Sequence, residues 1–177
     1  MIVRRTPIST AAPFDLSAVK AHLRLDSPDD DEALEAMARA AVAELEGYAQ
    51  LALLDQAVTV SLPAWPSLDD WPLPVAPLLD PASLSVTVAG TPFVEFGALP
   101  GLRPVLYPTG IVPEGRVEIA YLAGFGPSWA DIPADLRLAI LDQVAAAYDW
   151  RGNPELKGTG LSPHTARIAA RYRRVLA

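Results

Sequence analysis

The segment Pro133–Arg151, PADLRLAILDQVAAAYDWR, decides the fold of this 177-residue chain. Placed at about 100° per residue, as in an α-helix, its apolar side chains cover most of the helix circumference. Because so wide an apolar surface must be packed on several sides, we expect this helix at the centre of the fold. Pro133 suits its first turn and Gly152 the position just past its end. The apolar positions are Leu136, Leu138, Ile140, Leu141, Val144, Ala145, Ala147 and Tyr148.

One polar line runs along this helix. Asp135, Asp142 and Asp149 recur every seven residues and so fall within a narrow arc. Neighbours in this line are about two turns apart, roughly 10–11 Å. This exceeds the separation of the paired carboxylates of glycosidases. We therefore interpret the line as a solvated edge or a wall that faces a partner, and not as an acid/base pair.

Two helices are predicted before the central segment, after an extended arm at residues 1–14. Asp15 or Ser17 caps a short helix that runs to about Leu25. A longer helix begins within Asp29–Glu32, where acidic residues compensate the helix dipole. Spacings of three and four define the apolar faces of both helices. These faces are Leu16, Val19 and Leu23 in the first helix, and Leu34, Met37, Ala41, Leu45 and Tyr48 in the second.

After Leu54 the apolar period changes from helical to alternating, which predicts half-buried strands. Proline-rich connections separate them, and Ala89-Gly90 suits a hairpin tip. The strands are expected at Val58–Leu62, Leu84–Val88 and Val117–Tyr121, with weaker candidates at Phe93–Phe96 and Arg103–Tyr107.

The glycine-rich segment 152–160 is expected to be a mobile loop. A last helix begins at Ser162-Pro163 and runs to about Leu176. The predicted fold class is therefore α+β, mainly α. Residues 15–54 and 127–177 form a small helical bundle of two N-terminal and two C-terminal helices. Residues 55–126 form a small antiparallel β-subdomain inserted into this single domain, 1–177.

Charge is distributed unevenly along the chain, whose net charge is −7. Residues 1–14 carry +2, residues 15–149 carry −14 and residues 150–177 carry +5. The acidic body argues against a general nucleic-acid-binding protein, because it repels phosphates. Opposed charges in one small protein favour head-to-tail contact between copies. On the last helix, a basic stripe beside Tyr172 is compatible with a solvated face, a protein partner or a nucleic acid.

The composition also limits the chemistry. The absence of cysteine excludes disulfides, a thiolate nucleophile and cysteine-ligated metals. No apolar run reaches the roughly 18 residues that span a bilayer, and the N-terminus lacks the apolar core of a signal peptide. We therefore expect an unexported protein without a membrane segment.

No catalytic, cofactor or metal site is predicted, and the chain is not expected to be an enzyme. His22 is interpreted as a surface residue, and His164 lacks a recognisable orienting acid. The cluster Asp29–Glu32 lacks the spacing of a calcium loop. Gly124–Gly126 resembles part of a phosphate loop but lacks its third glycine and its Lys-Ser/Thr pair, so we interpret it as a strand-to-helix turn.

Four segments together carry a family resemblance. They are Leu16–Asp26 (LSAVKAHLRLD), Val117–Gly126 (VEIAYLAGFG), Ile132–Arg137 (IPADLR) and Ser162–Arg174. In this order they resemble the head-tail connector (adaptor) proteins of long-tailed double-stranded DNA phages and of gene transfer agents. The resemblance covers nearly the whole chain, and residues 63–116 carry least of it.

The resemblance implies a structural virion protein, made in the bacterial cytoplasm, that assembles into a ring, typically a dodecamer. The ring would lie beneath the portal protein and join the head to the tail or stopper protein, and DNA would pass through its central channel without specific binding. Residues from Ser162 onward would contact the portal or a neighbouring subunit. The alternative is a small nucleic-acid-binding accessory protein or an enzyme that uses His22 or His164. The partner-binding candidates are Arg167, Arg171, Tyr172, Arg173 and Arg174.

Overall fold

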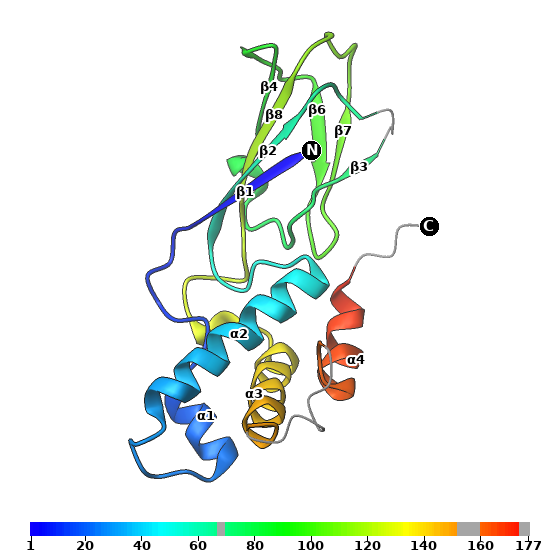
Figure 1. Ribbon diagram of the computed structural model, residues 1–177. Coiled ribbons are helices and arrows are strands. Elements are labelled where there is room, and N and C mark those ends of the chain that lie inside the picture. Colours follow the sequence, from blue (N-terminus) through cyan, green and yellow to red (C-terminus); the bar gives the residue numbers. More distant parts are fainter. Residues whose placement is uncertain (67–69, 152–159, 174–177) are drawn as a thin grey trace. The chain divides into compact units, whose positions relative to one another are not determined.

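The computed structural model describes residues 1–66, 70–151 and 160–173 (Figure 1). The fold class is α+β, as predicted: four helices pack together and the strands form antiparallel sheets. The chain divides into two compact units. The sheet unit comprises residues 1–10 and 54–127, and the helical unit comprises residues 11–53 and 128–177.

The helical unit is built around the central helix, as predicted. Helix α3 contacts each of the other three helices of the unit, and Leu136, Ile140 and Val144 on it are fully buried. Leu138 was expected among the packed apolar positions of this helix, but it is 42% exposed. The helices are α1 (Leu16–Leu23), α2 (Asp31–Ala49), α3 (Ala134–Asp149) and α4 (Pro163–Tyr172), with a short 3-10 helix, η2 (Trp129–Asp131), before α3.

The helix ends follow local rules in most places. The Asp15 carboxylate caps α1 by accepting from Ser17 N at 2.9 Å. Pro133 occupies the N-cap of α3, one position earlier than the first turn predicted for it. Helix α3 ends at Asp149, and Gly152, the predicted stop, lies outside the described residues. The predicted loop at 152–160 lies there too, apart from Gly160.

The sheet unit contains two antiparallel sheets. The larger has the strand order β1-β2-β8-β4-β5 and the smaller the order β3-β7-β6. Alternation of buried and exposed side chains along β8 explains why this strand was predictable from the sequence. The strands are β1 (Ile2–Pro7), β2 (Gln56–Leu62), β3 (Trp71–Pro72), β4 (Ser85–Val88), β5 (Thr91–Pro92), β6 (Phe96–Leu99), β7 (Val105–Pro108) and β8 (Val117–Ala123), with a 3-10 helix, η1 (Pro81–Ser83), before β4.

The N-terminal residues are more than an arm. Residues Ile2–Pro7 form β1, which pairs along its whole length with β2, from Ile2 opposite Ser61 to Pro7 opposite Gln56. Five of the six residues of this edge strand are exposed. Because neither of its faces is buried, its sequence lacks the alternation that identified the central strands.

Two glycine-containing turns have the conformation that the sequence predicts. Ala89 and Gly90, at the β4–β5 hairpin tip, have φ values of 51° and 82°. Gly124 follows β8 with φ at 146°, and a Cβ there would lie 2.8 Å from the backbone of Leu54 and Asp55. The Asp55 N–H donates to the carbonyl oxygen of Gly126 at 3.1 Å. Residues 124–126 thus allow close packing of two backbone segments in a turn.

Candidate functional site

The last helix, α4, is anchored to the helical unit by a buried threonine. Ser162 caps the helix, and its hydroxyl oxygen accepts from Thr165 N at 3.2 Å. The Thr165 hydroxyl donates to the carbonyl oxygen of Ala139 on α3 at 3.0 Å. Thr165 is fully buried, as is Ala169 one turn further on. The helix is therefore fixed by a specific hydrogen bond in addition to apolar packing.

Gln143 joins three segments of the helical unit. This α3 side chain is 4% exposed. Its amide nitrogen donates to Glu44 Oε2 on α2 at 2.7 Å, and its amide oxygen accepts from Ser162 N at 2.8 Å. A buried side-chain amide needs such partners to offset its desolvation. Gln143 was not among the residues predicted from the sequence, where its one signal is a polar residue within an apolar helix.

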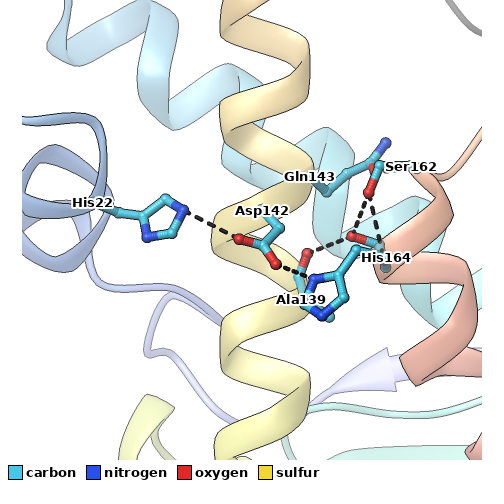
Figure 2. Close-up of polar contacts among 7 residues, drawn as sticks. His22, Ala139, Asp142, Gln143, Ser162 and His164 are labelled. Carbon is cyan, nitrogen blue, oxygen red and sulfur yellow. Dashed lines mark hydrogen bonds and ion pairs between the residues drawn. The ribbon is translucent and has the colours of Figure 1, made fainter.

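Asp142, one turn of α3 from the Thr165–Ala139 contact, bonds to both histidines of the chain. Its Oδ1 lies 3.2 Å from Nε2 of His22 on α1, and its Oδ2 contacts Nδ1 of His164 on α4. Figure 2 shows the carboxylate between the two imidazole rings. The expected solvated edge is wrong at this position, because the side chain is only 23% exposed and links α1, α3 and α4. His164 has an orienting acid that the sequence did not reveal.

A Ser-His-Asp relay would need the serine oxygen at the second nitrogen of His164. The Ser162 hydroxyl instead bonds to the Thr165 hydroxyl at 3.0 Å, so its observed role is to cap α4. Among the described residues, no group of three or more His, Asp and Glu side chains is arranged to hold a metal ion. The histidines therefore act here as hydrogen-bonding links between helices.

Asp135, two turns before Asp142, bonds to the other end of α4. The Tyr172 hydroxyl donates to Asp135 Oδ1 at 2.7 Å, and Arg171 Nη1 lies 3.6 Å from Asp135 Oδ2. Burial, together with the hydrogen bond and the negative charge of Asp135, raises the pKa of Tyr172 to about 12. Asp135 and Asp142 thus both hold α4, whereas Asp149 is exposed.

The structure separates the five partner-binding candidates. Arg171 and Tyr172 contact Asp135, and the Arg173 guanidinium lies over the Tyr48 ring, 5.0 Å from its centroid. Arg167 is exposed on α4. Arg174 lies outside the described residues. Three candidates therefore contribute to holding α4 within its own chain.

The acidic cluster at the start of α2 pairs with cations of the same unit. Arg151 Nη1 lies 2.9 Å from Asp30 Oδ1, and this hydrogen bond holds the pKa of Asp30 below its usual value. Lys20 Nζ lies 2.6 Å from Asp31 Oδ1. These pairs link the start of α2 to α1 and to the end of α3. Lys20 and Arg151 thus neutralise part of the negative charge of the Asp29–Glu32 cluster.

Comparison with known proteins gives full-length structural matches. One is to a chain from the neck of an empty gene transfer agent particle, computed with C6 symmetry, with 30% identity and a TM-score of 0.80. A chain from the virion of a native gene transfer agent particle matches with 29% identity and a TM-score of 0.78. A chain from the neck of a native particle, computed with C12 symmetry, matches with 27% identity and a TM-score of 0.76. Each match covers 100% of this chain and 97% of the other.

No protein-family model and no curated protein matches the sequence. Within the residues that the structure describes, no helix is long and apolar enough to cross a membrane. The match to the neck chain of the empty particle extends over the whole of this chain, and the two sequences are 30% identical. This chain belongs to the family of neck proteins of gene transfer agent particles.

Proposed function

We propose that this protein is a head-tail connector, or adaptor, subunit of a gene transfer agent or phage-like particle. In this proposal twelve copies form a ring between the portal protein and the tail or stopper protein, and DNA passes through the central channel. The observation that carries the proposal is the full-length match, at 30% identity, to a chain of a gene transfer agent neck. A structural role accounts for histidines that hydrogen-bond within the helical unit.

The symmetry of the similar assemblies supports a ring. Those necks were computed with C6 and C12 symmetry, and a ring of twelve equivalent copies satisfies both. Each copy in a cyclic ring meets its two neighbours through two different surfaces. The net charge of −7 supports a channel through which DNA moves without adhering, because like charges repel.

We further propose that α4 presents the surface that binds the portal or a neighbouring subunit. Arg171, Tyr172 and Arg173 would act indirectly, since their observed contacts hold the helix in place. Arg167 is an exposed cation of α4 that would meet an acidic surface of the partner. Arg174 is proposed to extend the same basic surface.

Charge reversal tests this assignment with little risk to the fold. Portal-bearing heads made without this protein are mixed with wild-type protein, Arg167→Glu or Arg24→Glu, and co-sedimentation is measured. Arg24 is the matched control, because it is also exposed and lies at the C-terminal cap of α1 in the same unit. We expect Arg167→Glu to weaken binding at least tenfold and Arg24→Glu to leave it within twofold.

Equal binding by Arg167→Glu and wild-type protein would refute the role of α4. Failure of the wild-type protein to bind heads at all would refute the connector function. The nucleic-acid-binding alternative predicts a different result, in which purified protein binds duplex DNA with an affinity that falls steeply with salt.

A further inference from the structure

The sheet unit exposes large apolar side chains at the two ends of one hairpin. Leu99 and Leu102 are 54% and 45% exposed, and Val94 and Ile111 are 80% and 92% exposed. Scattered apolar residues are normal on protein surfaces. These four are not scattered, because strands β6 and β7 and the segments that flank them place them in two pairs.

The first pair lies at the tip of the β6–β7 hairpin. Leu99 ends β6 opposite Val105, and Leu102 belongs to the connection between the two strands. The Leu73 N–H donates to the carbonyl oxygen of Pro104 at 2.9 Å, which ties the base of this tip to the chain beyond β3. Arg103, also exposed, gives the tip a positive charge. We call residues 99–103 the hairpin tip.

The second pair lies at the other end of the same strands. The Thr109 N–H donates to the carbonyl oxygen of Glu95 at 2.8 Å, which continues the pairing of β6 and β7 by one step. Val94 and Ile111 flank this bond. Phe93 is 7% exposed and packs edge-on against Trp65, so the alternation of side chains turns Val94 outward.

Exposed acids accompany this second pair. Glu95 lies between Val94 and β6, and Glu114 follows Ile111. We call residues 94–95 and 111–114 the strand-end surface. Four strand steps separate Glu95 from Leu99, about 13 Å. The hairpin tip and the strand-end surface are thus distinct, both are apolar, and they carry opposite charges.

We propose that the hairpin tip of one copy docks on the strand-end surface of the next copy. This inference rests on the proposed ring, which needs two complementary surfaces on each subunit. Apolar contact between the two pairs would supply the affinity, and Arg103 facing Glu95 and Glu114 would set the direction. Like charges would disfavour contact between two tips or between two strand-end surfaces, so a head-to-tail arrangement is favoured over a two-fold dimer.

The absence of cysteine in the chain permits a direct test by crosslinking. Particles are made with Leu102→Cys/Ile111→Cys as the only form of this protein and treated with a short bis-maleimide. We expect a ladder of multimers under denaturing conditions, because each copy joins its neighbour in turn. Leu102→Cys/Ala82→Cys is the control pair, since Ala82 is exposed in η1 and belongs to neither surface.

The other results of this experiment are equally decisive. Particles that contain the protein in the neck but give no ladder would overturn the docking and leave the connector function intact. Dimers formed by Leu102→Cys alone or Ile111→Cys alone would show a two-fold contact and overturn it, as would a crosslink to a different particle protein. Absence of the wild-type protein from the neck of particles would overturn both proposals.

A substitution supplies a second, independent measurement. Ile111→Asp places a charge on the strand-end surface, whereas Ile8→Asp, at a site that is 51% exposed, is the matched control outside both surfaces. We expect at least a tenfold loss of particle-bound protein for Ile111→Asp and less than a twofold loss for Ile8→Asp. Circular dichroism of the purified proteins checks that both variants fold. Equal incorporation of the two folded variants would contradict the docking.

Discussion

At the scale of single residues, Asp142 holds more of the helical unit together than either of the other two aspartates in its line. It bonds to His22 on α1 and to His164 on α4. Asp142→Asn removes the negative charge and one of its two acceptors, so we expect a loss of about 1 kcal/mol in the free energy of unfolding. Urea denaturation at pH 7 measures this loss.

Asp149→Asn is the matched control for this prediction. Asp149 lies two turns further along α3 and is exposed, and the described residues supply it with no side-chain hydrogen bond. Its substitution should change stability by less than about 0.5 kcal/mol. Equal losses for the two variants would mean that the histidine contacts contribute nothing measurable.

Tyr172 makes the attachment of α4 sensitive to alkaline pH. Its folded-state pKa is raised from 10.0 to about 12, so the folded protein favours the neutral phenol. The contribution of Tyr172 is therefore complete below pH 10 and is lost as the pH rises from 10 towards 12. Burial also raises the pKa of Tyr121, so only a comparison with Tyr172→Phe isolates this contribution.

The comparison is made by urea denaturation at pH 8 and at pH 11.5. Wild-type protein should be more stable than Tyr172→Phe at pH 8, because phenylalanine lacks the hydroxyl that donates to Asp135. The advantage should shrink at pH 11.5, because Tyr172 of the unfolded chain, with its ordinary pKa of 10.0, is then ionised and this favours unfolding. An advantage that stays constant between the two pH values would contradict the assigned hydrogen bond.

Sequence reasoning succeeded at residues whose partners are close in the chain. Asp15 and Ser162 are caps, and a cap bonds to an amide two or three residues away. The partners of Asp142 lie on helices that are distant in sequence, and no local pattern encodes the packing that brings His22 and His164 to one carboxylate. The same reason hid the contact of Tyr172 with Asp135.

At the scale of elements, α4 depends on Thr165 for its position. Thr165→Val keeps the shape of the side chain but removes the hydroxyl that bonds to Ala139 and Ser162. Because this site is fully buried, we expect a loss of about 1–2 kcal/mol. Hydrogen exchange of the amides in 163–172 should accelerate, since α4 would separate more often from α3.

Thr59→Val serves as the control, because Thr59 is exposed on β2 of the sheet unit. It should leave exchange in α4 at the wild-type rate. Unchanged exchange in Thr165→Val would show that apolar packing of Ile168 and Ala169 alone fixes the helix.

The elements that the sequence identified are those with one buried face. Helix α2 shows this, since Leu34, Ala41 and Leu45 recur at helical spacing and are all buried. Strand β1 escaped detection, because five of its six residues are exposed and its sequence therefore shows no alternation, although it pairs along its whole length with β2. Strand β3 escaped as well, since two residues within a proline-rich connection carry no period.

At the scale of the whole molecule, residues 54–127 interrupt the helical unit in sequence and join residues 1–10 in the sheet unit. The chain enters it at Leu54 and leaves it at Pro127, and the nearby Asp55 N–H and Gly126 carbonyl are hydrogen-bonded at 3.1 Å. A short Gly-Ser linker can therefore bridge residues 53 and 128. We expect a chain of residues 11–53 and 128–177 joined in this way to fold alone.

Circular dichroism and thermal denaturation check this expectation. The shortened chain should show strong helical ellipticity at 222 nm and a single cooperative transition. A gradual loss of ellipticity without a transition would indicate that the helical unit needs the sheet unit to fold.

The pairing of β2 with β8 has a mechanical consequence. These strands carry the chain into and out of the sheet unit, and the pair Gln56–Ala123 lies at the end of the ladder nearest both junctions. Tension applied through the polypeptide at the two junctions would act on this residue pair first. The hydrogen-bonded pairs of β2 and β8 would then separate one after another, instead of all at once. We therefore expect the sheet unit to open at a low force when its two junctions are pulled apart.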